Sequence, residues 1–415
     1  MPPRSHLLYL SAIIFAGVLL GYVHRAIFPL YAIVFASFFL SAFLLARRIK
    51  RFGWIVHNLA FVFLALALAE LYFGFEQTSE QAAFPHTWHS LPLESSLSSL
   101  GYINWPGTFR AVKTYGFGTG VVYDVHYSID KNHMRVTPDS PRGHGPAIMF
   151  FGDSFTFGQG VNDDETLPNA FSILSGMRVL NFGASGYGPQ QMLRLLELDI
   201  PKIVEPQFPR LMVYTALAEH IQRAAGHADW DQDGPLYEVE NDRARYVGSF
   251  SEHNMACDPM AIKRTVIERL LEASSIWQAY AGSDYCSASH DMDTLKHDRT
   301  RFLAIVKDAS AIAQQKYQSN LVVILWDSTR ADDSTEQDVQ WIEAKLLDNN
   351  IPTLTLSKTV KERHFDSWII ERDGHPDPRA YREVAKTLIS WLQQNPGLLA
   401  PLLSKEPRPP DGALP

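Results

Sequence analysis

The sequence predicts an α/β protein in which helices cover both faces of a parallel sheet, with a membrane segment at the amino terminus. From residue 146 onward, short apolar strands alternate with stretches of helical pattern, such as Pro189–Asp199 and Met260–Tyr280. Near-continuous apolar strands separated by helices are typical of a parallel sheet buried on both faces. The first 75 residues instead contain three long apolar runs. The five predicted strands are Ala147–Phe151, Arg178–Asn181, Leu211–Ala216, Leu321–Trp326 and Pro352–Leu356.

The three uncharged runs are Leu7–Val23, Ala26–Ala46 and Trp54–Ala69. Crossing ~30 Å of hydrocarbon takes about 20 helical residues, so the second run is long enough and the other two are somewhat short. A cleaved signal peptide is the alternative for the first run. Against it, only Arg4 forms a basic end, and no clear small-residue cleavage site precedes Arg25. We therefore predict three transmembrane helices within residues 1–75.

The loop Arg47–Arg51 carries four positive charges in five residues, which predicts that it lies in the cytoplasm. Everything after about residue 74 is then outside. In a bacterium this means a multi-pass inner-membrane protein with a periplasmic domain, where a Cys257–Cys286 disulfide is chemically feasible. With only these two cysteines, the chain has neither a disulfide scaffold nor a cysteine-based zinc cluster.

The β-rich segment Val121–Ile129 alternates apolar and polar residues, which predicts a half-buried strand. Between the third and fourth predicted strands, an insertion at about 220–320 includes a predicted hairpin at 235–250. The predicted order is a membrane anchor at 1–75, a small β-containing module at 76–145, the α/β domain at 146–395 and a disordered tail at 396–415.

The charge balance excludes one class of partner. With 37 Lys and Arg against 45 Asp and Glu, the net charge is −8, and no basic stripe lies outside the membrane flanks. Phosphate binding needs such a stripe, so we predict no nucleic-acid partner.

Three segments carry candidate chemistry. The first strand ends in Gly152-Asp153-Ser154, where a serine after a buried strand can present its hydroxyl at the rim of the sheet. The second strand leads into the glycine-rich segment Asn181–Gly188. Near the end, Asp373-Gly374-His375-Pro376 precedes a helical stretch at 379–394. A histidine is the usual base for a serine nucleophile, and a carboxylate orients it.

Together, GDSFTFGQGV, NFGASGYGPQQ and DGHP resemble the blocks of the SGNH hydrolase superfamily, the GDSL lipases and esterases, in order and spacing over residues 146–395. The resemblance implies a flavodoxin-like three-layer α/β/α fold with five parallel strands. It also implies ester hydrolysis or acyl transfer with no cofactor and no metal.

By position, the resemblance makes Ser154 the nucleophile, His375 the base and Asp373 its orienting acid. The backbone N–H groups of Ser154 and Gly183 would form part of the oxyanion hole. Candidate substrate contacts beside them are Asp153, Asn181 and Tyr187, although packing in the core is the alternative for Tyr187.

Two departures from the family pattern bear on activity. The third block normally supplies Gly-x-Asn-Asp, whose Asn donates to the oxyanion, whereas the third strand here runs into Leu217-Ala218-Glu219-His220. His220 is the substitute candidate and Glu219 would repel an oxyanion, but a structural role for both is the alternative. The last block is Asp-x-His rather than Asp-x-x-His, as it is in membrane-associated polysaccharide O-acetyltransferases.

We therefore predict a serine esterase that removes an acyl or acetyl group from a small molecule, lipid or glycan on the extracytoplasmic side. One alternative is O-acyl transfer to a cell-envelope glycan, which would need a membrane partner as acyl donor. A second alternative is a catalytically silent protein that keeps the fold and binds the ligand.

Overall fold

The computed structural model describes residues 30–46, 53–76, 79–82, 96–143, 145–205, 209–253, 274–275, 292–326, 333–356 and 368–399. The first apolar run, the basic loop, both cysteines, the predicted helix Met260–Tyr280 and residues 400–415 lie wholly or almost wholly outside these ranges. By its internal contacts the chain divides into two compact units. Unit 1 comprises 1–81, 112–122 and 259–283, and unit 2 comprises 82–111, 123–258 and 284–415.

Unit 2 is built on the predicted five-stranded parallel sheet. Its strands follow the order β10-β9-β6-β4-β5, which is 2-1-3-4-5 in chain order from the other edge. This is the flavodoxin-like order, in which the switch of direction lies between the first and third strands, here β4 and β6. The strands are β4 (Ile148–Phe151), β5 (Val179–Asn181), β6 (Leu211–Ala216), β9 (Leu321–Leu325) and β10 (Thr353–Thr355).

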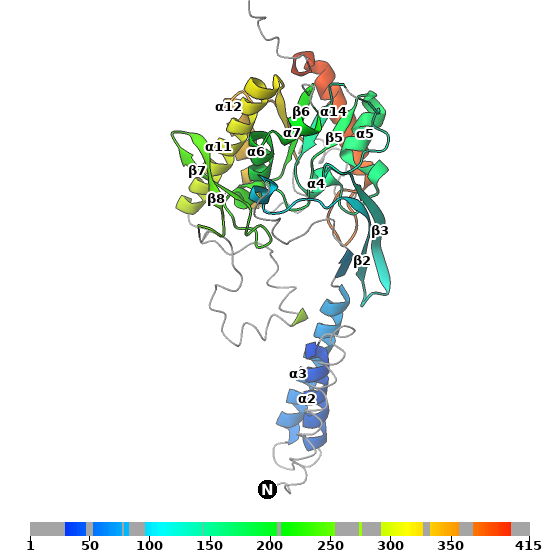
Figure 1. Cartoon of the computed structure of the whole chain (residues 1–415). Helices are drawn as coiled ribbons and strands as arrows, with labels where there is room; N and C mark the ends of the chain where they lie inside the picture. The colour runs from blue at the N-terminus through cyan, green and yellow to red at the C-terminus, as the bar shows by residue number, and fades with distance from the viewer. Residues whose placement is uncertain are drawn as a thin grey trace, which may run out of the picture. The chain divides into compact units, whose positions relative to one another are not determined.

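Helices cover both faces of this sheet, as the apolar strands predict (Figure 1). Phe150 and Val213 pack in one cluster with α5 (Leu167–Ser175) and α14 (Pro378–Gln394). Their strand neighbours, including Phe151 and Tyr214, pack in the opposite cluster. The helices of that second layer are α6 (Pro189–Glu197), α11 (Met292–Tyr317) and α12 (Asp333–Asp348).

The insertion between β6 and β9 begins with α8 (His220–Ala224) and contains the predicted hairpin, β7 (Pro235–Glu240) paired with β8 (Arg243–Ser249). Tyr237 of β7 and Ile305 and Ala309 of α11 belong to the same core cluster. The remaining short helices of unit 2 are η1 (Ser96–Leu100), α4 (Ser154–Phe157), η2 (Asp163–Glu165), α7 (Ile200–Val204) and η4 (Pro396–Leu398).

The predicted disordered tail starts too early. Residues 396–398 form η4, and the carbonyl of Leu398 accepts a hydrogen bond from Asn320 Nδ2 at 3.0 Å. This contact joins η4 to the residue before β9, so the described domain extends to residue 399.

Unit 1 contains α2 (Leu30–Ala46) and α3 (Gly53–Glu76), which pack through stacked rings such as Phe38 and Phe63, 5.2 Å apart. Among the described residues, only Trp54–Phe75 in α3 is long and apolar enough to span a membrane. The apolar stretch of α2, Tyr31–Leu45, is shorter. The third run is therefore longer than predicted, because its helix continues past Glu70 to Glu76. The second run ends at Ala46 as predicted, and its first four residues lie outside the described part of the chain.

The predicted β-containing module includes a three-stranded sheet in the order β1-β2-β3. Its strands are β1 (Ser79–Ala82), β2 (Gly107–Tyr115) and β3 (Gly120–Ile129). In β3, Tyr123, Val125, Tyr127 and Ile129 are buried, as the alternation predicts, whereas Val121 is exposed. The boundary between the two units crosses β2 and β3.

Candidate active site

The structure brings Ser154 together with His375 and Asp373, although the serine lies more than two hundred residues from the other two in the chain. The Ser154 hydroxyl lies 2.8 Å from His375 Nε2, and His375 Nδ1 lies 2.6 Å from Asp373 Oδ2. With Nδ1–H donating to the buried carboxylate, Nε2 is left as the acceptor for the serine proton. This is the geometry of a nucleophile, its base and the acid that orients the base.

Ser154 owes its position to the end of β4. After Phe151 the chain turns at Gly152, and Ser154 begins the single-turn helix α4. Gly152 has φ +146°, and a side chain there would lie 2.4 Å from Thr156 Oγ1 and 3.0 Å from the Thr215 carbonyl. Only glycine fits this turn, which leaves Ser154 at 6% exposure at the carboxyl edge of the sheet.

His375 and Asp373 lie on a tight turn that leads into α14. The Ile370 N–H donates to the His375 carbonyl at 2.8 Å, and Gly374 takes the left-handed conformation between the two side chains. The His375 ring packs against Phe155, with ring centres 5.6 Å apart. The Asp373 carboxylate is fully buried and the His375 side chain is 19% exposed, so the pair meets solvent on the histidine side.

The second loop packs directly on the backbone of α4. A side chain at Gly183 would lie 2.5 Å from the Phe157 nitrogen and 2.9 Å from the Thr156 carbonyl carbon. Asn181 stabilises the same contact between the second loop and α4, because its Nδ2 donates to the Thr156 carbonyl at 3.0 Å. The glycine is therefore required by close approach of two backbones.

Behind the nucleophile, Asp153 is the centre of a buried polar network. Its Oδ1 accepts the Phe155 N–H at 3.0 Å, and its Oδ2 contacts Arg223 Nη1 at 2.9 Å and His220 Nε2 at 3.1 Å. Burial alone would raise the pKa of the Asp153 carboxyl, but the His220 and Arg223 interactions outweigh it and lower the pKa to about 2. Asp153 is therefore a charged structural group paired with Arg223.

His220 is fully buried in this network. Burial lowers its pKa, against the effect of the neighbouring Asp153, so the ring is neutral. Because the carboxylate can only accept, we assign the proton to Nε2, and Nδ1 then accepts from the Tyr214 hydroxyl at 2.6 Å. Both ring nitrogens are engaged away from the nucleophile, so the proposed use of His220 as oxyanion donor does not fit its position.

The other predicted oxyanion donors differ from each other. The Ser154 N–H makes no hydrogen bond with any described residue, so it is available to donate to an oxyanion. The Gly183 N–H donates instead to Asn181 Oδ1 at 2.9 Å. For Gly183 to bind an oxyanion, the Asn181 side chain would have to release it.

The three predicted substrate contacts are all buried in this structure. Asp153 has no exposed surface and holds Arg223, and Asn181 is likewise fully buried with both amide atoms engaged. The Tyr187 hydroxyl donates to the Tyr102 carbonyl at 2.6 Å, and its ring packs against Tyr102. In this structure the polar atoms of all three residues are paired inside the protein, and their contact with substrate stays a prediction.

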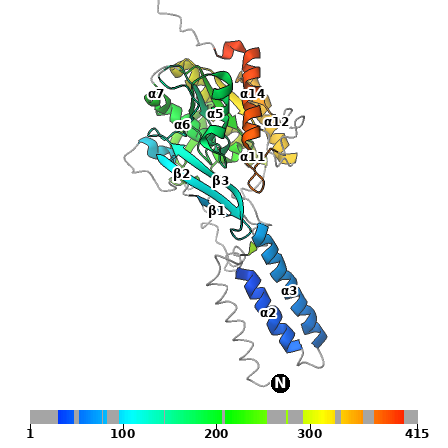
Figure 2. The same ribbon diagram turned by 90° about the vertical axis from the view of Figure 1, so that its right-hand side faces the viewer.

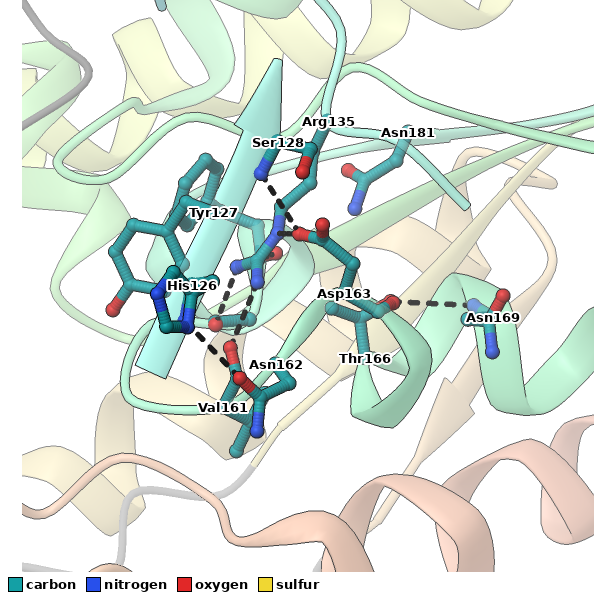
Figure 3. A network of polar contacts seen from close by, with 12 residues as sticks. His126, Tyr127, Ser128, Arg135, Val161, Asn162, Asp163, Thr166, Asn169 and Asn181 are labelled. Carbon is teal, nitrogen blue, oxygen red and sulfur yellow. Dashed lines mark hydrogen bonds and ion pairs between the residues drawn. The ribbon is translucent and has the colours of Figure 1, made fainter. Parts of the chain in front are cut away.

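Arg135 belongs to no sequence motif, yet it holds the loop that follows the nucleophile (Figure 3). Its guanidinium donates to the carbonyls of Phe157, Gly158 and Val161 at 2.7–2.9 Å and to Asp163 at 3.1 Å. It is 1% exposed and lies over the Tyr127 ring at 4.4 Å. A lone arginine between Met134 and Val136 carries no motif, so only its apolar neighbours hinted at burial.

The described residues contain no group of three His, Cys, Asp or Glu side chains placed to hold a metal ion. The absence of a cofactor, which the resemblance implies, stays a prediction. Glu219, directly before α8, has its Oε2 buried with no hydrogen-bond partner among the described residues.

Comparison with known proteins gives likenesses of structure. No protein-family model and no curated protein sequence matches the chain. Among solved structures, it is similar to a member of the lipolytic G-D-S-L family from Veillonella parvula (14% identity, 60% of this chain and 100% of that chain, TM-score 0.34). It is also similar to a lipase/acylhydrolase from Enterococcus faecalis (15%, 60% and 97%, 0.30). A third is an acetyl xylan esterase from Butyrivibrio proteoclasticus (9%, 62% and 66%, 0.33).

We expect Gly183→Ala to lower the free energy of unfolding by at least about 3 kcal/mol, because the added methyl group collides with the backbone of α4. Gly176→Ala is the control without a collision: unlike Gly183, Gly176 is left-handed, at φ +68°, but it has nothing within 4 Å of the added atom. It should cost about 1 kcal/mol. Chemical denaturation of the purified chain measures both, and equal losses would contradict the contact.

Arg135→Met should destabilise the protein by about 3 kcal/mol and lower any activity that depends on Ser154, because three buried carbonyls and Asp163 lose their donor. The control is Arg245→Met, whose partners Glu238 and Glu240 are exposed and whose loss should cost less than about 1 kcal/mol. Denaturation of the two variants side by side tests this, and a stable Arg135→Met protein would refute the role.

The Asp153 charge should make stability depend on acid. Because its folded pKa of about 2 lies below the ordinary value of 3.8, its contribution is complete above about pH 4 and is lost as pH falls toward 2. The shift corresponds to about 2 kcal/mol. Denaturation from pH 5 to pH 2 should show a steeper loss in the wild type than in Asp153→Asn. Parallel curves would contradict a lowered pKa of the Asp153 carboxyl.

Proposed function

We propose that this chain is a serine esterase of the SGNH type, which removes an acyl or acetyl group from an ester. The observation that carries the proposal is the unbroken chain of hydrogen bonds from Ser154 Oγ through His375 to Asp373, at 2.8 and 2.6 Å. A serine hydroxyl becomes nucleophilic when a positioned base accepts its proton, and the buried carboxylate stabilises the imidazolium that forms.

In the proposed reaction, Ser154 Oγ attacks the ester carbonyl carbon while His375 Nε2 takes the hydroxyl proton. The Ser154 N–H is placed to donate to the oxyanion that develops. His375 then passes the proton to the departing alcohol, which leaves an acyl group on Ser154. Water, activated by the same histidine, attacks this acyl-enzyme and releases the acid.

We further propose that the enzyme is anchored in a bacterial inner membrane through α3, with unit 2 on the extracytoplasmic side. Support comes from the three apolar runs, the candidate span Trp54–Phe75 and the basic loop Arg47–Arg51. Added protease that digests unit 2 in spheroplasts but not in inverted vesicles would agree with this orientation. The reverse pattern would exclude it.

A second candidate function is ligand binding without turnover. Two observations favour it: the Gly183 N–H is engaged by Asn181, and His220 is buried away from the nucleophile. An oxyanion hole that lacks a donor loses roughly 3–4 kcal/mol of transition-state stabilisation. A site weakened in this way would still accept an ester ligand.

We expect the full-length chain in detergent micelles to hydrolyse p-nitrophenyl acetate. In triad enzymes, removal of the nucleophile or of the orienting carboxylate costs about 10⁴-fold or more in kcat, and we expect this for Ser154→Ala and Asp373→Asn. Ser185→Ala is the matched control, because Ser185 is also buried, at 8% exposure, and its hydroxyl has no hydrogen-bond partner among described residues.

Turnover that survives in Ser154→Ala would overturn the assignment of the nucleophile. A folded wild type that binds the ester without hydrolysing it would favour the second candidate. Adding a glycan acceptor to the active enzyme separates the two ester chemistries, since hydrolysis releases free acetate and transfer leaves acetyl on the glycan.

A further inference from the structure

The turn between β2 and β3, residues Tyr115–Gly120, lies against the end of α3 within unit 1; we call it the hairpin tip. Figures 1 and 2 both show the hairpin reaching the last turns of this helix. The Gly116 N–H donates to the carbonyl of Phe75 at 3.0 Å. The Phe75 ring meets Tyr115 edge-on at 6.3 Å and Phe117 at 6.1 Å, so three aromatic rings gather at one point.

This aromatic cluster faces outward. Phe75 is 42% and Phe117 37% exposed, and Tyr72, one turn earlier in α3, is 62% exposed. Phe117 also has φ +56°, a left-handed conformation that costs a bulky residue on the order of 1–2 kcal/mol. Exposure of the Phe117 ring to water does not offset this strain, whereas transfer of the ring into a partly apolar medium would.

The position of the cluster along α3 identifies that medium. Phe75 is the last residue of the candidate span, and Trp54, 68% exposed, is the first. The 22 residues between these limits measure about 33 Å, which matches the ~30 Å of a hydrocarbon core. Tryptophan and tyrosine collect where the hydrocarbon meets the headgroups, at both ends of a span. Trp54 begins this span, and Tyr115 packs on Phe75 at its other end.

We propose that the hairpin tip is a lipid-binding surface, whose Tyr115 and Phe117 enter the headgroup region beside the end of α3. The inference rests on the proposed insertion of α3 in the membrane and adds a second contact with the bilayer outside the helices. Phe75 joins the two contacts, because it packs on the hairpin tip and ends the span. The partner is the lipid interface itself.

Two glycines of the hairpin tip allow a matched test. A side chain on Gly116 would lie 2.8 Å from Thr119 Oγ1 and 3.0 Å from the Phe75 ring, whereas one on Gly118 would have nothing within 4 Å. Both residues are left-handed, at φ +61° and +86°. Alanine at either site therefore adds similar backbone strain, but only Gly116→Ala pushes the tip away from Phe75.

The experiment uses the full chain in phosphatidylcholine vesicles that contain a lipid with a photoreactive diazirine near its glycerol backbone. After illumination, mass spectrometry maps the lipid adducts on peptides. We expect adducts both on α3 and on residues 115–118, with the same pattern in Gly118→Ala. In Gly116→Ala, adducts at the hairpin tip should fall at least fivefold relative to those on α3.

A wild type labelled on α3 but not at the hairpin tip would overturn the proposal, and so would a chain labelled on neither. Equal labelling in the two glycine variants would contradict the role of Phe75. If Gly116→Ala does not fold, Phe117→Ser tests the same surface without a new steric clash, and its tip adducts should fall likewise. Ester hydrolysis measured on the same vesicles depends on Ser154, so failure of the lipid contact and failure of the esterase assignment are told apart.

Discussion

The carboxylate of Asp153 joins the two strand ends on which the candidate site depends. Through Oδ1 it caps α4 at the Phe155 N–H, and through Oδ2 it binds His220 and Arg223 of α8 beyond β6. Since β4 and β6 flank the point where strand order reverses, this one side chain fixes the edge at which flavodoxin-like sheets bind ligands. A full charge can remain in that apolar setting only because Arg223 pairs with it.

Besides Asp153, three residues fix the position of the nucleophile. Gly152 allows the backbone of β4 to turn tightly, Gly183 lets the second loop rest on α4, and Arg135 binds three carbonyls of the loop after the helix. Arg135 reaches the loop from the chain that follows β3. Arg135, in the segment predicted as the β-containing module, is therefore part of the support of Ser154, since it donates to the carbonyls of the loop after α4.

Much of the fold could be predicted, because buried parallel strands are apolar along their whole length and remain visible in one sequence. The proximity of Ser154, His375 and Asp373 could be predicted from motif order, since parallel strand ends meet at one edge. Arg135 and the burial of His220 could not. Arg135 carries no local pattern. His220 lies where the pattern that the chain resembles has an asparagine, and an equivalent role was therefore the expectation. In the fold its ring turns inward, because Asp153 and Tyr214 satisfy both of its nitrogens.

The central claim is that Ser154 is an activated nucleophile, and reaction with a fluorophosphonate tests it most directly. The folded chain is treated with the reagent at neutral pH, and peptides are mapped by mass spectrometry. The account predicts one phosphonyl adduct, on Ser154, which disappears when His375→Gln removes the base. A folded wild type that forms no adduct, or one that carries it on another serine with Ser154 unmodified, would contradict the account.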